Sequence, residues 1–466
     1  MSEFVTALYD FRSKQSYIYR TNKIREISGA SQILSDMYEQ FFCIARQNDL
    51  KIESDLSVPF SITRFEKSDL DGQVVYIGGG NLYMLYKSRE VFIRANKLFS
   101  RFTLEKTHTL SLIASGVAFT GNFSADRAAL YKENMRKKNT GFISKPVTVL
   151  PYTQVDPVTF LPVSERQAGL EEAISRDRVL KRWAYKPVGT TDISEIVDEE
   201  SSDIAIIYTD GNKIGEKLKN LTADQTDYDN CVKKLRDFSK KITEIYIDAP
   251  IRAISDELSK QGYSRFRQII GGGDEITLIC NAHAVIDVVR AYYRALKSAS
   301  EAAGEEFHAC TGVAICQKSA PFSQVYKIAE ACCKSAKDKC RGDSASASNY
   351  IDFHNCHGSV GDFEQARAVQ EAKYTLRPYE IEDFLDRFAE FNTHIGRPVS
   401  RSDMKNIRDA IVKGDVYYGI ELERIKAKYP ALCGVSYKDE EQKKLFFDIA
   451  DVYTQWFDAD DREDCE

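Results

Sequence analysis

The chain contains the same sequence pattern twice, and this internal duplication limits what it can fold into. The second copy reads Ile204-Ala-Ile-Ile-Tyr-Thr-Asp210-Gly-Asn-Lys, then Gly271-Gly-Gly-Asp274-Glu275, then Thr311-Gly-Val-Ala-Ile. The first copy reads Val5-Thr-Ala-Leu-Tyr-Asp10, then Gly78-Gly-Gly-Asn81-Leu82, then Ser115-Gly-Val-Ala-Phe. The three segments follow one another at similar intervals in both copies. Each copy is therefore expected to form one module of the same fold.

The two copies differ in their acidic residues. When the glycine runs are matched, Asp274 and Glu275 of the second copy become Asn81 and Leu82 in the first. The second module is therefore expected to hold a metal ion. The first module is expected to be a degenerate partner that assists it.

Size and composition bound the class of protein. A chain of 466 residues is long enough for two or three domains. No apolar run reaches the length of a membrane span, so we expect no membrane association. The 11 cysteines lack paired spacing, which favours reduced thiols in the cytoplasm. The net charge of −6 argues against a dedicated duplex-binding surface.

Changes in pattern along the chain divide it into four regions. We expect a first module over 1–150, a linker over 151–203, a second module over 204–355 and a helical region with an acidic tail over 356–466. In the linker, Leu170, Ile174, Val179 and Leu180 have roughly helical spacing, and an acidic stretch follows over 192–203. In the last region, Ser400 and Gly414 are expected to cap a helix.

The second module has the order strand, helix, hairpin, strand, helix. The apolar run Ile204–Tyr208 is typical of a buried strand, and residues 229–258 are expected to form a long helix. Segments 266–270 and 276–280 flank the glycines as the arms of a hairpin. A sheet covered by helices, of the α+β class, is therefore expected.

Three carboxylates are the candidate metal ligands. Asp210 ends a predicted strand, while Asp274 and Glu275 lie at the predicted hairpin tip. Carboxylate oxygens suit hard cations, so Mg²⁺ or Mn²⁺ is the expected cofactor. A pair of such ions stabilises both the attacking and the leaving oxygen in phosphoryl transfer. Each residue alone also has an ordinary explanation as part of a turn or a helix cap.

Further residues are candidates for nucleotide binding. Gly211, Asn212 and Lys213 precede a predicted helix start, where backbone N–H groups bind phosphate. Gly272 and Gly273 let the backbone approach a nucleotide closely. Lys337 could neutralise a triphosphate, although a solvated lysine is the simpler interpretation. Ser31 is a candidate from the first module, with a helix-start serine as the alternative.

One further cluster is set aside. His354, Cys356 and His357 are too close in sequence for a standard metal site.

These motifs resemble a known family. The run Gly272-Gly-Asp-Glu-Ile276 resembles the GGDEF signature of diguanylate cyclases. It also resembles the Gly-Gly-Asp-Asp of the palm domains in the large subunit of type III CRISPR effectors. The CRISPR subunit is the more similar, because it carries two palms with the first degenerate. Its opening segment resembles Ile24-Arg-Glu-Ile-Ser-Gly29-Ala-Ser-Gln, and its catalytic palm resembles Tyr208-Thr-Asp210-Gly-Asn-Lys. A helical domain after the second palm also fits.

The resemblance implies two tandem ferredoxin-like palms, a helical linker and a C-terminal helical domain. It implies nucleotidyl transfer from ATP or another NTP, with cyclic oligoadenylates as common products in antiviral defence. Asp210, Asp274 and Glu275 would then hold the metal, and Lys337 the triphosphate. The implied partners are a guide RNA–protein effector complex or a downstream effector that binds the product.

The sequence also departs from the family. It contains no His-Asp pair, so we expect no HD nuclease domain and no DNA cleavage by this chain. The stretch 151–165 contains no cysteine, so a structural zinc site is not expected there. The acidic pair is Asp-Glu rather than Asp-Asp.

The expected function is that of a metal-dependent nucleotidyltransferase that makes cyclic oligonucleotides. A homodimer is compatible with it but not required, because the internal repeat supplies a second half. Three alternatives stay open at this point: a mononucleotide cyclase, a diguanylate cyclase, and a non-catalytic scaffold subunit that binds nucleotide or RNA.

Overall fold

The structure is a computed structural model, and it forms two compact units. The described residues are 3–140, 151–166, 172–185, 196, 203–223, 227–260, 266–342, 348–356, 367, 373–389, 391–395, 399–436 and 438–457. Unit 1 comprises residues 1–188, 213–244 and 272–274, and unit 2 comprises 189–212, 245–271 and 275–466. Each unit contains one of the two large sheets found in the described residues, and β6 (Val163–Arg166) and β7 (Ala173–Ser175) form a further two-stranded sheet.

The sheet of unit 1 has the strand order β2-β3-β4-β1-β5. Its strands are β1 (Val5–Arg12), β2 (Ile52–Glu53), β3 (Gly72–Gly78), β4 (Asn81–Tyr86) and β5 (Ser111–Ala118). The ring of Tyr9 packs against Phe41 of α2 (Ile24–Gln47) and Phe99 of α4 (Arg89–Thr107). These two helices cover one face of the sheet. The first module also contains α1 (Lys14–Ile18), α3 (Ile62–Lys67) and α5 (Phe123–Thr140).

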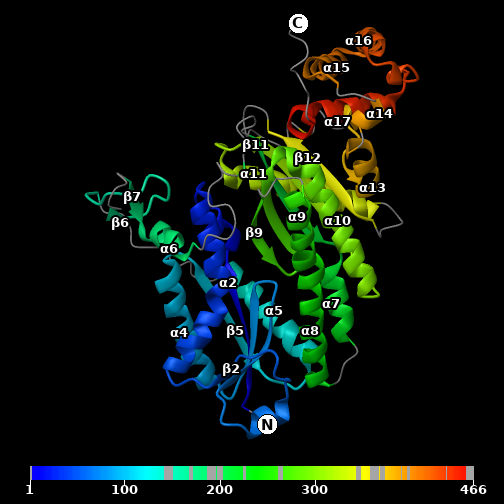
Figure 1. Cartoon of the computed structure of the whole chain (residues 1–466). Helices are drawn as coiled ribbons and strands as arrows, with labels where there is room; N and C mark the ends of the chain where they lie inside the picture. Colours follow the sequence, from blue (N-terminus) through cyan, green and yellow to red (C-terminus); the bar gives the residue numbers. More distant parts are fainter. Residues whose placement is uncertain are drawn as a thin grey trace. The chain divides into compact units, whose positions relative to one another are not determined.

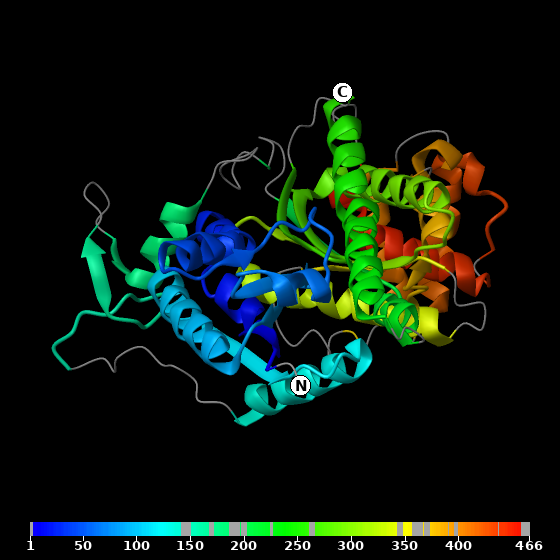
Figure 2. The ribbon, with the colours of Figure 1, turned by 90° about the horizontal axis from the view of Figure 1, so that it is seen from below.

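The sheet of unit 2 has the strand order β13-β12-β11-β8-β10-β9. Its strands are β8 (Asp203–Gly211), β9 (Phe266–Gly272), β10 (Glu275–Asn281), β11 (Ala309–Gln317), β12 (Tyr350–Asn355) and β13 (Tyr379–Glu380). The associated helices are α9 (Ala249–Lys260), η3 (Ala282–Ala284), α10 (Val285–Ala302) and α11 (Phe322–Gly342). Helices α9 and α10 lie side by side (Figure 1, Figure 2).

The two sheets share one topology. The order β5-β1-β4-β3 in unit 1 corresponds to β11-β8-β10-β9 in unit 2, and the central strands pair antiparallel in both. This is the strand order of the ferredoxin-like βαββαβ fold, in which the last strand of the motif lies beside the first strand. The predicted α+β class with two tandem ferredoxin-like palms is confirmed.

The buried central strand of unit 2 follows from its composition. Residues Ile204–Tyr208 are all buried, and β8 has a neighbouring strand on each side. A strand with neighbours on both sides and helices over it needs apolar side chains on both faces. The continuous apolar run predicted this position.

Helices α7 (Ile214–Ala223) and α8 (Tyr228–Thr243) belong to unit 1, although they follow β8 in the sequence. Tyr228, Cys231, Val232 and Leu235 of α8 join the hydrophobic core that contains Leu8 and Leu85. The domain boundaries predicted above stay predictions, but the compact units divide the 204–355 segment between them.

Arg236 fixes α8 to the sheet of unit 1. It is buried, and its guanidinium donates to four backbone carbonyls: those of Leu56, Val58, Val74 and Val75, at 2.6–3.2 Å. A planar group with five donors can satisfy several carbonyls at once, which a lysine cannot do in this geometry.

The predicted long helix over 229–258 is one helical run with an irregular turn. Helix α8 leads into the π-helical turn η2 (Glu244–Asp248), and α9 continues from it. The boundary between the two units falls in this turn, after Glu244. Short π-helical insertions of this kind are uncommon and often occur at functional positions.

The linker differs in part from its prediction. It forms β6 (Val163–Arg166), β7 (Ala173–Ser175) and α6 (Arg176–Ala184). Ile174 is therefore in a strand, and only Val179 and Leu180 of the predicted stripe are helical. Leu170 and the acidic stretch 192–202, apart from Ile196, lie outside the described residues.

The linker is attached to α2 by buried ion pairs. Arg178 is fully buried and bonds Glu26 at 3.0 Å, Asp156 at 3.1 Å and Glu172 at 2.7 Å. Arg182 also bonds Glu26 and Glu172. Burial alone raises the pKa of Glu172, but its bonds to these two arginines outweigh it and lower that pKa to about 2.

The C-terminal region of unit 2 is helical, as predicted. It contains α13 (Ile381–Phe384), η4 (Leu385–Ala389), α14 (Phe391–Ile395), α15 (Arg401–Lys413), α16 (Asp415–Lys428), η5 (Pro430–Leu432) and α17 (Glu440–Trp456). Ser400 accepts the backbone N–H of Asp403, and Gly414 ends α15 at φ 118°. Both predicted caps are confirmed. None of the described helices is long and apolar enough to cross a membrane.

We predict that Arg236→Met destabilises the protein by about 3 kcal/mol, because it leaves buried carbonyls without donors. Urea unfolding followed by circular dichroism measures the change. Lys233→Met, at an exposed position of the same helix, is the control and should change the stability by less than about 0.5 kcal/mol. Equal stability of both variants would contradict the role assigned to Arg236.

Candidate functional site

Asp210 and Glu275 form the centre of the candidate site. Asp210 lies near the end of β8 and Glu275 begins β10, and the antiparallel register places the two residues directly opposite each other. Residues opposite each other in such a pair project from the same face of the sheet. Two carboxylates distant in sequence therefore meet on one surface of unit 2.

That surface faces helix α11. Tyr208, two residues before Asp210, packs edge-to-face on Tyr326 of α11. The pKa of Tyr208 is raised first by burial, and then by the negative charges of Glu275 and Asp210. By contrast, Thr209 points to the opposite face, where its hydroxyl bonds Thr311. The alternation of a strand thus places both acids on the α11 side.

Lys337 of α11 contacts Asp210 directly. Its ammonium lies 2.6 Å from Asp210 Oδ2 and donates to the carbonyl of Gly211 at 3.0 Å. Both side chains are partly exposed, 18% for Lys337 and 31% for Asp210, so a ligand can reach them. The sequence predicted Lys337 as a candidate, and the structure brings it to Asp210.

Asp274 lies at the turn beside Glu275. The hairpin turn consists of Gly273 and Asp274, and Gly273 has φ +67°, a backbone conformation that favours glycine. Within unit 1, the negative charge of Asp274 contributes to the raised pKa of Tyr76, for which burial is the first cause. Gly272 ends β9 and is exposed.

The described residues contain no group of three His, Cys, Asp or Glu side chains arranged as ligands of one ion. The three predicted acids therefore do not form a complete ligand set on their own. Mg²⁺ commonly takes only one or two carboxylates and completes its shell with water and substrate phosphates. Asp210 and Glu275 fit that kind of site, with Asp274 next to it.

The predicted phosphate loop fits less well. The backbone N–H of Asn212 donates to the carbonyl of His308 at 2.8 Å, and its side chain donates to the thiols of Cys310 and Cys340. Asn212 is thus engaged within the protein. Lys213 follows at φ +59°, and its carbonyl accepts the N–H groups of Glu216 and Lys217 in the first turn of α7.

The structure corrects the match between the two copies by one residue. In β1 and β4, Tyr9 is opposite Leu82, so Asp10 faces Asn81. The turn of the first hairpin is Gly79-Gly80, whereas the turn of the second is Gly273-Asp274. Asn81 therefore corresponds to Glu275 and not to Asp274.

The same shift follows for the other matched positions. Gly80 corresponds to Asp274, and Leu82 corresponds to the buried Ile276. The glycines of the third segment also differ. A Cβ on Gly116 would meet Phe92 of α4, whereas one on Gly312 would meet α11, so they lie on opposite faces. Since side chains alternate along a strand, a one-residue error in a sequence match reverses every face.

Ser31 lies within α2, seven residues after its first residue Ile24, so a helix-start serine is wrong. The neighbouring Gly29 has a packing role, because a Cβ there would lie 1.8 Å from the carbonyl oxygen of Lys181. No bond of Ser31 is found in the described part of the chain that would connect it to the acids.

The segment around His354 and Cys356, which the sequence analysis excluded as a metal site, belongs to the sheet of unit 2. His354 and Cys356 are in or next to β12, and burial, the first cause, lowers the pKa of His354 to about 4. His357 lies outside the described residues.

Sequence reasoning missed two lysines in the first module, Lys14 and Lys138, both bonded to Asp10. The repeat could have identified Lys138. It lies fifteen residues after Phe123, the first residue of α5, as Lys337 lies fifteen residues after Phe322, the first residue of α11.

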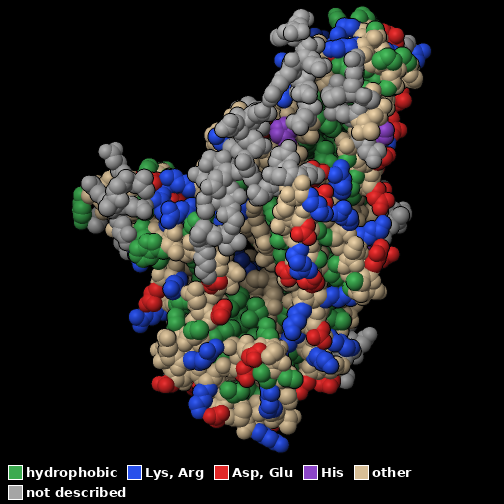
Figure 3. All heavy atoms as spheres, viewed as in Figure 1, with side chains coloured by type: hydrophobic (Ala, Val, Ile, Leu, Met, Phe, Trp, Pro, Cys, Tyr) green, Lys and Arg blue, Asp and Glu red, His purple; other side chains and the backbone are tan. Residues whose placement is uncertain are grey.

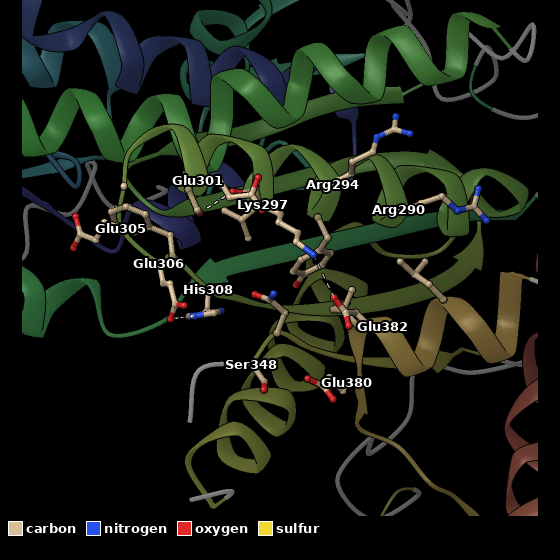
Figure 4. A pocket seen from close by; sticks show the side chains of 18 residues that line it. Arg290, Arg294, Lys297, Glu301, Glu305, Glu306, His308, Ser348, Glu380 and Glu382 are labelled. Atoms are coloured by element: carbon tan, nitrogen blue, oxygen red, sulfur yellow. Dashed lines mark hydrogen bonds and ion pairs between the residues drawn. The ribbon is translucent and has the colours of Figure 1, made fainter. Parts of the chain in front are cut away.

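Unit 2 also contains a cavity of about 650 Å³ on the α10 side. It is lined by the second half of α10, the segment 304–308 and the start of α13. In Figure 4, Lys297 and Glu382 point toward one another, 3.9 Å apart, and His308 lies 3.7 Å from Glu306. On the face in Figure 3, acidic and basic side chains are interspersed.

Comparison with known proteins agrees with this geometry. Residues 203–345 match the family model of the Cas10/Cmr2 second palm domain. The solved structure of Csm1 in T. onnurineus has a TM-score of 0.58 and 12% sequence identity, over 98% of this chain and 69% of that one. The comparison with curated proteins found no match.

Two complexes are similarly related. The Csm1-Csm4 cassette in complex with cA4 has a TM-score of 0.58, and the cassette in complex with one ATP has 0.56. Both are 12% identical, over 97% of this chain and 69% of that chain. At this identity the likeness shows a shared fold.

The second module is thus a palm domain of the Cas10/Cmr2 type. The rest of the chain has the fold of Csm1, so the similarity agrees with the sequence resemblance to the large subunits of type III CRISPR effectors.

We predict that Gly312→Ala destabilises the protein by about 1–3 kcal/mol and displaces α11. Its Cβ would lie 2.0 Å from the carbonyl oxygen of Ala329 and 2.3 Å from the nitrogen of Cys333, both backbone atoms of α11. Thermal unfolding measures the loss.

Gly215→Ala is the matched control. A Cβ at Gly215, in α7, meets no atom within 4 Å, so this variant should be neutral or slightly stabilised. A Gly312→Ala protein as stable as Gly215→Ala would show that α11 is not packed as described.

Proposed function

We propose that the chain is a metal-dependent nucleotidyltransferase that uses NTPs, with ATP as the first candidate, to make cyclic oligonucleotide messengers. The observation that carries the proposal is the pairing of Asp210 with Glu275 on one face, with Lys337 bonded to Asp210. Carboxylates beside a mobile lysine provide both a cation site and a charge partner for phosphate.

The related structures support the choice of ATP. Csm1-Csm4 cassettes have been solved in complex with one ATP, with pppApA and with cA4. For this chain, an adenine substrate and a cyclic product follow only by analogy of fold. A type III effector complex is the corresponding partner, together with an effector that binds the product.

Asp210, Glu275 and Asp274 are the residues that would hold Mg²⁺ or Mn²⁺. When bound, such an ion neutralises phosphate charge and favours ionisation of an attacking hydroxyl. The carboxylate of Asp210 pairs with Lys337 and is partly exposed, so a cation can share it.

Lys337 is the residue that we propose for contact with the triphosphate. In the protein alone it bonds Asp210 and the carbonyl of Gly211, and both acceptors lie at the end of β8. When a nucleotide is present, we propose that its ammonium turns to the triphosphate and stabilises the pyrophosphate as it leaves. A flexible point charge on a four-carbon stem suits such a movement.

The orientation of the two nucleotides supplies the rest of the proposed catalysis. The 3′-hydroxyl of one nucleotide attacks the α-phosphorus of the other, the P–O bond to pyrophosphate breaks, and the hydroxyl proton passes to solvent. No side-chain nucleophile is needed, because orientation and charge neutralisation supply most of the rate. The exposed Gly272 allows the backbone to lie close to the nucleotide.

We predict that the protein, incubated with ATP and Mg²⁺ or Mn²⁺, releases pyrophosphate and forms oligoadenylates visible by mass spectrometry. Asp210→Ala and Asp274→Ala/Glu275→Ala should lower the rate by about 10²–10³-fold, the size of effect expected when a charge that stabilises the transition state is removed. Asp338→Asn, at an exposed acid of α11, is the control and should keep full activity.

Other products would favour one of the alternative functions. A 3′,5′-cyclic mononucleotide alone would favour a mononucleotide cyclase, and strict use of GTP a diguanylate cyclase. Nucleotide binding without Mg²⁺ and without pyrophosphate release, with the type III partners present, would favour a scaffold subunit.

We also predict that Lys337→Met lowers kcat by about 10–100-fold, since the leaving pyrophosphate loses its counter-charge. Lys334→Met, one turn earlier on α11 and exposed, should have no effect. Initial rates of pyrophosphate release compare the two. If both variants have wild-type rates, Lys337 is only a structural partner of Asp210.

A further inference from the structure

The degenerate first module keeps part of the site in altered form. Asp10 of β1 occupies the place of Asp210, and Lys138 of α5 occupies the place of Lys337. Lys138 bonds Asp10 as Lys337 bonds Asp210. The aspartate–lysine pair is therefore present in both modules.

The acids of the hairpin tip are absent from the first module. Gly80 takes the place of Asp274, and Asn81 the place of Glu275. With its amide nitrogen turned toward the carboxylate, Asn81 donates to Asp10 Oδ1 at 3.0 Å. An acceptor for a cation has thus become a donor to an anion.

A second lysine completes this cluster. The ammonium of Lys14 lies 2.8 Å from Asp10 Oδ1 and donates to the carbonyl of Gly80 at 2.9 Å. It thereby bridges the positions that in the second module carry Asp210 and Asp274. Residue 14 corresponds to Ile214, since Ser13 and Lys213 precede them with the same left-handed backbone.

The matched positions of the two tips differ in charge. At the first tip they carry two ammonium groups, those of Lys14 and Lys138, and the one carboxylate of Asp10. At the second tip they carry three carboxylates and the ammonium of Lys337. A divalent cation suits the carboxylates of the second tip, but it would be repelled by the two ammonium groups of the first.

The cluster is also built into the fold. The Asp10 side chain is only 6% exposed, and Lys14 and Lys138 are 28% and 34% exposed. Burial raises the pKa of Asp10, but the two lysines outweigh burial and lower that pKa, so the carboxylate stays ionised. Each ammonium has three donors, and Lys14 uses two of them on Asp10 and Gly80.

We propose that Lys14 replaces a divalent cation in the first module, so that this tip binds a phosphate-bearing anion without metal. Of the two tips, only the second would then bind a divalent metal ion. This inference does not depend on catalysis, because it concerns binding by unit 1.

The first test measures Mn²⁺ binding by electron paramagnetic resonance, using Asp274→Ala/Glu275→Ala as the parent so that the second tip is disabled. The parent should bind no Mn²⁺ tightly. Adding Lys14→Ile and Asn81→Glu copies the second module at the first tip and should create about one new Mn²⁺ site per chain. Tight Mn²⁺ binding at the first tip of the parent, abolished by Asp10→Asn, would overturn the proposal.

The second test measures binding of inorganic tripolyphosphate in EDTA by calorimetry, again with the parent. Lys14→Met should weaken binding by about tenfold or more, and Lys14→Arg should largely retain it. Lys97→Met, at an exposed lysine of α4, is the control. Folding of each variant is verified by its melting temperature. Binding that is equal in Lys14→Met and Lys97→Met, or absent from the parent, would refute the anion site.

The two proposals can fail separately. Loss of nucleotidyl transfer with an intact first tip would count against the proposed function only. An active enzyme whose first tip binds Mn²⁺ would count against this inference only.

Discussion

The antiparallel pairing of β8 with β10 is the constraint on which the candidate site depends. It places Asp210 opposite Glu275, so that two carboxylates distant in sequence project from one face of the sheet. A shift of one residue in this pairing would move one carboxylate away from α11 to the opposite face, where Thr209 and Thr311 bond each other. The buried run Ile204–Tyr208 resists such a shift, because both of its faces are packed.

The fold was largely predictable from the sequence, and the reasons are physical. The buried strand, the hairpin arms, the long helix and the caps at Ser400 and Gly414 each depend on local patterns that few structures satisfy. The approach of Lys337 to Asp210 was less evident, because it needs α11 to pack closely at Gly312. The sequence alone favoured a solvated lysine at this position, and the family resemblance gave Lys337 the triphosphate role.

The errors also have physical causes. The sequence match aligned the two Gly-Gly-Gly runs, but the turn begins at the second glycine of the first run and at the third glycine of the second run. Composition does not reveal where a turn begins, since any neighbouring pair in a glycine run suits a two-residue turn. Ser31 was expected either to face a nucleotide or to start a helix, but it lies within α2, where the neighbouring Gly29 serves the contact between α2 and α6. Ile174 joined a helical stripe by spacing alone, although β-branched residues also favour strands.

Helix α8 has a consequence for how the protein is made. Its side chains complete the core around Leu8 and Leu85, and Arg236 satisfies carbonyls of β3 and of the segment before α3. Domains usually fold as units while the ribosome is still adding residues. Here the N-terminal sheet must wait for a helix translated more than a hundred residues after β5, so nascent chains that stop in the linker would expose an apolar surface to chaperones.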